Sequence, residues 1–71
     1  MADFPFGEGT RVVIRHALHE ASHSATDSLG YVSARNATHV VVATARGLET
    51  IALADIIAAK EVPPPPAPRN R

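Results

Sequence analysis

The 71-residue sequence contains no cysteine, which excludes a disulfide framework and a thiolate-bound metal site. This absence fits a reducing compartment, and we expect a cytoplasmic protein. No apolar run approaches the length needed to cross a membrane, and the acidic start "MADFPFGEGT" lacks the basic region of a secretory signal. We therefore expect neither export nor a membrane partner.

Aromatic residues and net charge are also scarce. Two phenylalanines, one tyrosine and no tryptophan leave Val, Ile and Leu to form the core, and 71 residues allow only one small domain. Seven basic and seven acidic residues cancel to a formal net charge of zero. Because phosphate contacts supply much of the affinity for nucleic acid, this balance disfavours a nucleic-acid partner.

Alternating β-branched residues predict five short strands. The first covers residues 9–18, "GTRVVIRHAL", where Val12, Ile14 and Leu18 fall at even spacing. Further strands are predicted over residues 29–36, 38–44, 48–53 and 57–62, with a helical turn at 54–56. Residues 19–28 are expected to form an exposed loop. A helix is the alternative for "HALHEASH" and for "LADIIAAKE", whose alanines favour it.

These elements predict an all-β fold, a small five-stranded SH3-like barrel with one helical turn before the last strand. Closure of the barrel would remove exposed sheet edges. Gly30 within the second strand indicates a bulge or a sharp bend, and Val32 and Ala34 are expected to point inward. The predicted core consists of Val12, Ile14, Val32, Val40, Val42, Ile51, Leu53 and Ile56.

Three segments follow from this assignment. Residues 1–8 form an irregular lead-in that Phe4 or Phe6 is expected to hold against the barrel. Residues 9–62 form the barrel. Residues 63–71, "PPPPAPRNR", form a proline-rich linker of polyproline II type, at about 3 Å per residue.

Three stretches resemble the N-terminal SH3-like domain of bacterial GNAT-family N-acetyltransferases: "GTRVVIRHAL", "TDSLGYV" and "VVVATARGLETIALADIIAAKEVPP". In that family the domain opens with a Gly-Thr-Arg-Val-Val strand. It closes with an Ala-Asp-Ile or Ala-Asp-Val turn and a strand ending in Val-Pro, before a proline-rich linker to the acetyltransferase domain. The similarity covers residues 9–64, whereas "HALHEASHSA" is longer and richer in histidine than the family pattern.

The resemblance implies a non-catalytic module. Acetyltransferases of this family bind the pyrophosphate of acetyl-CoA on a glycine-containing loop at a helix start, and no such loop followed by a helix occurs in this sequence. We therefore expect no catalytic residue and no cofactor in this chain, because acetyl-CoA would belong to the catalytic domain. The expected partner is that C-terminal catalytic domain, or another protein.

Two groups of side chains are candidates for binding. His16, His19 and His23 would share one face of a helix and suit zinc or nickel, although a strand end and a solvated loop are the favoured interpretation. The alternative function is a free-standing module that binds RNA, a ribosomal protein or another protein. The surface patch for that role would be Arg11, Arg15, Arg35, Arg46 and Tyr31.

Overall fold

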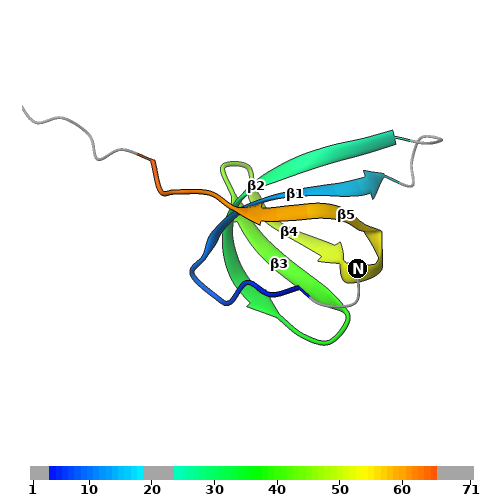
Figure 1. Ribbon diagram of the computed structural model, residues 1–71, viewed down its shortest axis with the longest axis horizontal. Helices are drawn as coiled ribbons and strands as arrows, with labels where there is room; N and C mark the ends of the chain where they lie inside the picture. Colours follow the sequence, from blue (N-terminus) through cyan, green and yellow to red (C-terminus); the bar gives the residue numbers. More distant parts are fainter. Residues whose placement is uncertain (1–3, 19–23, 66–71) are drawn as a thin grey trace, which may run out of the picture.

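The computed structural model describes residues 4–18 and 24–65, which form one antiparallel sheet of five strands. The strands lie in the order β4-β3-β2-β1-β5, and a single turn of 3-10 helix precedes the last strand among the described residues (Figure 1). The elements are β1 (Arg11–Leu18), β2 (Ser24–Arg35), β3 (His39–Thr44), β4 (Gly47–Ala52), η1 (Leu53–Asp55) and β5 (Ile56–Glu61). The predicted all-β fold with five strands and a helical turn is confirmed.

The prediction that the sheet closes into a barrel is wrong, because β4 and β5 form the two edges of the sheet. The η1 turn carries the chain from one edge to the other, and β5 then pairs with β1. Apolar side chains cover the core beside this turn. Ile56 is buried there, and Leu53 packs against the buried cluster. No helix among residues 4–18 and 24–65 is long and apolar enough to cross a membrane.

The long strand β2 is shared between two neighbours. Residues 24–31 pair with β1, whereas residues 30–35 pair with β3. Gly30 lies where the two pairings overlap, and a Cβ atom at this position would be 2.1 Å from the carbonyl oxygen of Ala43. Glycine is therefore required because the backbones of β2 and β3 approach closely, as glycine within a strand often indicates.

A β-bulge lies beyond Gly30, at Ser33. Val32 pairs with Val42, but the next pair joins Ala34 to Val41, so one extra residue is accommodated in β2. Because of this extra residue, the residues after Ser33 face the opposite side of the sheet from the one that strict alternation predicts. Ala34 is consequently exposed, which corrects the prediction that it points inward.

The core consists of eight buried apolar side chains, and it includes every predicted core residue except Leu53, which is half-buried. They are Phe4, Val12, Ile14, Val32, Val40, Val42, Ile51 and Ile56. Phe4 was not in the predicted core, but it does hold the N-terminal segment against the sheet. The guanidinium of Arg35 donates hydrogen bonds to the carbonyl oxygens of Phe4 and Phe6 and lies 5.3 Å from the centre of the Phe4 ring.

Two secondary-structure predictions are also corrected. The segment 24–28 belongs to β2 rather than to a loop. The strand was not predicted there because its alternation places hydroxyl groups, not aliphatic groups, on the inner face. The alternative helix over residues 53–61 is wrong, since β5 occupies most of that segment. For the alternative helix over residues 16–23, β1 continues to Leu18 and the remaining residues lie outside the described part of the chain.

Candidate functional site

Three polar side chains meet on the inner side of the sheet, next to the apolar core. His16 comes from β1, Ser28 from β2 and Glu49 from β4. Strand alternation directs them inward, because His16 follows the buried Ile14 by two residues and Glu49 precedes the buried Ile51 by two. The polar group therefore continues the row of side chains that forms the core.

A chain of two hydrogen bonds connects these three residues. The Ser28 hydroxyl donates to Oε1 of Glu49 at 2.6 Å, and Nε2 of His16 lies 2.9 Å from the same Oγ. Because the single hydroxyl proton is directed to the carboxylate, Nε2 of His16 carries a hydrogen and donates it to Oγ. Ser28 is only 5% exposed, so its two partners replace the water that burial removes.

The direction of these hydrogen bonds limits the chemistry of Ser28. In a serine hydrolase the histidine accepts the hydroxyl proton and so activates the nucleophile. Here His16 donates to the hydroxyl oxygen, and the proton of Ser28 is held by Glu49. The acceptor of the Ser28 proton is thus a carboxylate, which differs from the histidine acceptor of a serine hydrolase.

The three residues line a cavity of about 530 Å³, which we call the polar cavity. It opens beside the part of β2 that pairs with β1 alone, where β3 no longer runs alongside. The nine lining residues are His16, Leu18, Thr26, Asp27, Ser28, Arg46, Glu49, Thr50 and Ile51. The cavity thus combines two carboxylates, a guanidinium, an imidazole and hydroxyl groups with two aliphatic side chains.

The opposite, outer face of the sheet carries a second candidate surface. Leu48, Ala43 and Tyr31 are cross-strand neighbours on β4, β3 and β2, and Leu29 pairs with Val13 on β1. We call these five residues the outer apolar band. The exposed fractions are 69% for Leu48, 47% for Leu29 and 41% for Tyr31, so the band is open to solvent.

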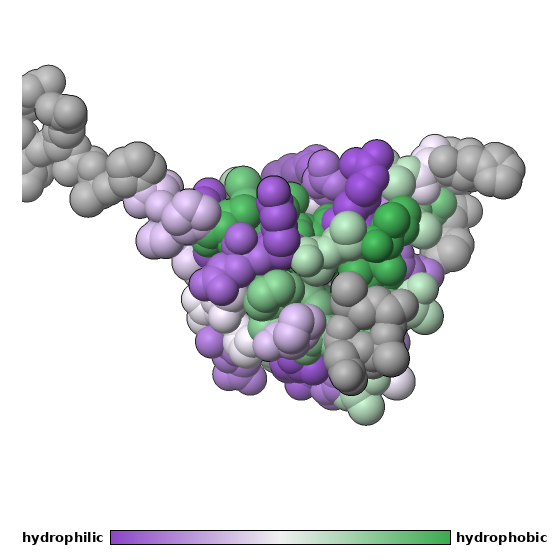
Figure 2. Space-filling model, in the orientation of Figure 1, coloured by the Kyte–Doolittle hydropathy of each residue, from purple (hydrophilic) through white to green (hydrophobic). Residues whose placement is uncertain are grey.

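A groove of about 380 Å³ runs beside the band. Tyr31 and Leu29 line it together with Arg11 and Pro65, so the proline-rich segment starts at this surface. Figure 2 shows apolar surface in green next to the point where the pale purple proline segment leaves the domain. The groove therefore joins apolar side chains to the beginning of the predicted linker.

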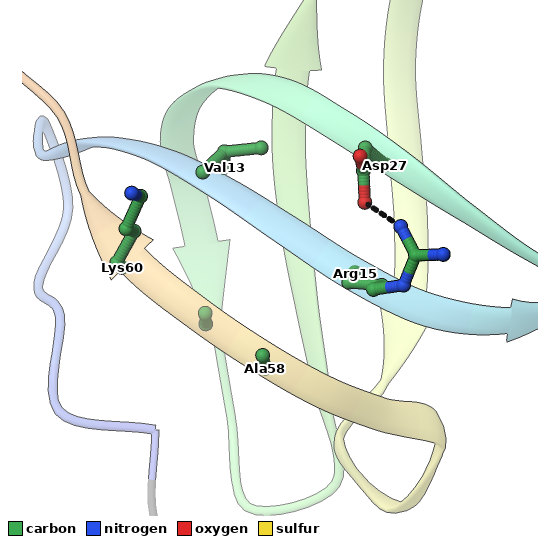
Figure 3. A pocket seen from close by; sticks show the side chains of 6 residues that line it. Val13, Arg15, Asp27, Ala58 and Lys60 are labelled. Atoms are coloured by element: carbon green, nitrogen blue, oxygen red, sulfur yellow. Dashed lines mark hydrogen bonds and ion pairs between the residues drawn. The ribbon is translucent and has the colours of Figure 1, made fainter.

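A smaller pocket of about 220 Å³ lies on the outer side of β1 and β5. Figure 3 shows Arg15 and Asp27 directed toward one another across β1 and β2, with Val13 and Lys60 toward the other end of the pocket. The Arg15 guanidinium is 3.2 Å from the Asp27 carboxylate, and both side chains are more than half exposed. Such exposed pairs contribute little to stability.

The structure places the predicted patch residues at several different surfaces. Arg11 and Tyr31 are cross-strand neighbours, and Arg11 donates a hydrogen bond to the carbonyl oxygen of Pro63 at 2.6 Å. Arg15 pairs with Asp27, as described above, and the Arg35 guanidinium bonds to the carbonyls of the N-terminal segment. Arg46 lines the polar cavity. A joint binding role for these residues stays a prediction.

Of the predicted metal ligands, only His16 lies within the described residues, where it bonds to Ser28. His19 and His23 lie outside them. Within the described residues, no group of three or more His, Asp or Glu side chains is arranged to hold a metal ion. The histidine metal site stays a prediction.

Sequence analysis did not identify the polar cavity. The available signal was the even spacing of Ser24, Thr26 and Ser28, which placed hydroxyl groups on one face of a strand. Pairing Ser28 with Glu49 required the register and curvature of the folded sheet, because 21 residues separate them along the chain.

The fold defines a small all-β domain built on one five-stranded antiparallel sheet. A scan of protein-family models finds no match, and searches of curated proteins and of solved structures find none either. A function for the chain is therefore inferred from its own residues and surfaces.

Proposed function

We propose that the chain is a non-catalytic interaction module that docks on a protein partner through the outer apolar band. The proposed partner is an acetyltransferase domain of the GNAT family, joined to the module by the proline-rich segment. The observation that carries the proposal is the exposed apolar band beside the start of that segment.

The band differs from ordinary exposed apolar residues because its members are neighbours. Single exposed aliphatic side chains are common on soluble proteins. Here Leu48 and Tyr31 flank Ala43 across three adjacent strands, and Leu29 continues the surface along β2. A contiguous apolar surface of this kind is typical of a protein contact.

The start of the linker is fixed next to the band. The backbone N–H of Val62 donates to the carbonyl oxygen of Arg11 at 2.9 Å, and the Arg11 guanidinium bonds to Pro63. Pro65 then lines the same groove as Tyr31. A domain attached through this stiff segment would remain close to the band at high effective concentration, which favours docking without a large interface.

In this proposal the two domains have different roles. Acetyl-CoA and the acetylated substrate belong to the partner domain, as the resemblance implies, and the module supplies a surface that holds or orients that domain. The first test is the reading frame beyond residue 71. A frame that continues into an acetyltransferase domain supports the fusion, and a frame that stops there overturns it.

The second test measures docking directly. We expect the isolated acetyltransferase domain, added to the 15N-labelled chain, to shift the amide signals of Leu29, Tyr31 and Leu48. Leu48→Glu should weaken binding about tenfold or more, because it places a charge within an apolar contact. Leu48 is 69% exposed, so this change should leave the fold intact.

Ile57→Glu is the matched control, since Ile57 is 59% exposed but lies outside the band, at the register shift between β1 and β5. It should leave the affinity nearly unchanged. Equal weakening by both substitutions would contradict docking at the band. A structured RNA hairpin tests the alternative function, and salt-sensitive binding that depends on Arg11, without binding to the acetyltransferase domain, would replace this proposal.

A further inference from the structure

We propose that the polar cavity binds a small zwitterion of the amino-acid type, with the ammonium group at Glu49 and the carboxylate at Arg46. The site lies on the inner side of the sheet, so the proposal is independent of docking at the outer apolar band. It rests on two opposite charges that line one cavity and do not pair with each other.

The carboxylate of Glu49 is held in place for such a ligand. One of its oxygens, Oε1, accepts the Ser28 hydroxyl, and Ser28 is buried and fixed in turn by His16. The partner that orients Glu49 is thus a neutral hydroxyl, which does not compensate the formal charge of the half-buried carboxylate. A cation in the cavity would compensate that charge, and an ammonium group offers both charge and hydrogen-bond donors.

Arg46 supplies the opposite charge from the turn between β3 and β4. The backbone N–H of Arg46 donates to the hydroxyl oxygen of Thr44 at 3.1 Å, which fixes the base of the side chain. A guanidinium is suited to bind a carboxylate through two parallel hydrogen bonds. Asp27 also lines the cavity, but its carboxylate is already paired with Arg15, so Glu49 is the acid left for a ligand cation.

The size and the remaining lining residues fit an aliphatic amino acid. The cavity volume of about 530 Å³ lies within the range of small-molecule sites, about 300 to 1,000 Å³. Leu18 and Ile51 provide apolar contacts between the polar groups, and Thr26 and Thr50 add hydroxyl groups. A ligand with charged ends and a short aliphatic body matches all of these features.

Three probes of matched shape test the assignment. L-Leucine carries both charges, 3-methylbutylamine carries only the ammonium group, and 4-methylpentanoate carries only the carboxylate. In titrations followed by 1H–15N NMR spectra of the full chain, L-leucine should give saturable shifts at His16, Ser28 and Glu49. It should bind about tenfold or more tightly than either single-charge probe, because each charge-assisted contact adds that much.

Two substitutions assign the two ends of the ligand. Glu49→Gln and Arg46→Gln should each weaken L-leucine binding about tenfold or more. Glutamine at position 49 keeps an oxygen that can accept a hydrogen bond from the Ser28 hydroxyl. Arg46 is an exposed turn residue, so Arg46→Gln should fold normally. Arg11→Gln is the matched control, since Arg11 lines the outer groove, and it should leave binding unchanged.

Two results would overturn the proposal. The first is the absence of saturable shifts at the cavity residues with L-leucine. The second is equal binding of L-leucine and 3-methylbutylamine together with no effect of Arg46→Gln, because the carboxylate end would then have no site.

Discussion

The two halves of β2 belong to one strand but have different inner faces. In residues 30–35 the strand pairs with β3, and its inward side chain, Val32, belongs to the apolar core. In residues 24–29 it pairs with β1 alone, and its inward side chains are hydroxyl groups. The inner face of the strand is thus apolar where a second neighbour encloses it and polar where one neighbour is missing.

This difference has a physical reason. A side chain enclosed between paired strands loses its water, so an aliphatic group is favoured there. Beside the open part of β2, water or a ligand can reach the inner face. The side chain there is polar, and the hydroxyl group of Ser28 has hydrogen bonds with Glu49 and His16. The polar cavity is therefore a consequence of the length of β2 beyond the end of β3.

The junction between the two halves should be the most sensitive position. We expect Gly30→Ala to destabilise the protein by about 3 kcal/mol, because the new methyl group would collide with the backbone oxygen of Ala43, which cannot move without separating β2 from β3. Urea denaturation followed by circular dichroism measures the effect. Gly7→Ala is the control, since nothing lies within 4 Å of a Cβ there, and equal stability of both variants would contradict the close approach.

The enclosed half of β2 should show the next largest effect. Val42, the partner of Val32 on β3, is fully buried, and Val42→Ala should lower the free energy of unfolding by about 2 kcal/mol through lost contacts and a residual void. Thermal denaturation of Val41→Ala provides the comparison, because Val41 is the adjacent residue on the other face of β3. If Val42→Ala and the parent protein melt at the same temperature, Val42 does not belong to the core.

Sequence patterns predicted the enclosed half of the sheet better than the open half. Val12, Ile14, Val40 and Val42 alternate with less buried residues, so period-2 patterning located their strands and their inward faces. The segment 24–28 was missed because its inward residues are polar, and such a strand has no hydrophobic period. Hydropathy alone therefore underestimated the length of β2.

Other features depend on the folded chain rather than on local sequence. The bulge at Ser33 exposes Ala34, and two small residues give no pattern that indicates which of them is the extra one. Whether the sheet closes depends on how β4 and β5 are placed, which the helical turn sets only in three dimensions. The contact between Ser28 and Glu49 likewise follows from the register of β2, β3 and β4 and from the curvature of the sheet.

The open half of β2 should tolerate substitution better than the enclosed half. Ser28→Ala removes two hydrogen bonds, but we expect a loss of only about 1 kcal/mol, because water in the polar cavity can take the place of the hydroxyl for His16 and Glu49. Thr26→Val, at the next inward position, is the matched control and should have a smaller effect still. A loss for Ser28→Ala as large as that for Val42→Ala, measured in the same urea titrations, would mean that the cavity excludes water and that both halves of β2 enclose one continuous dry core.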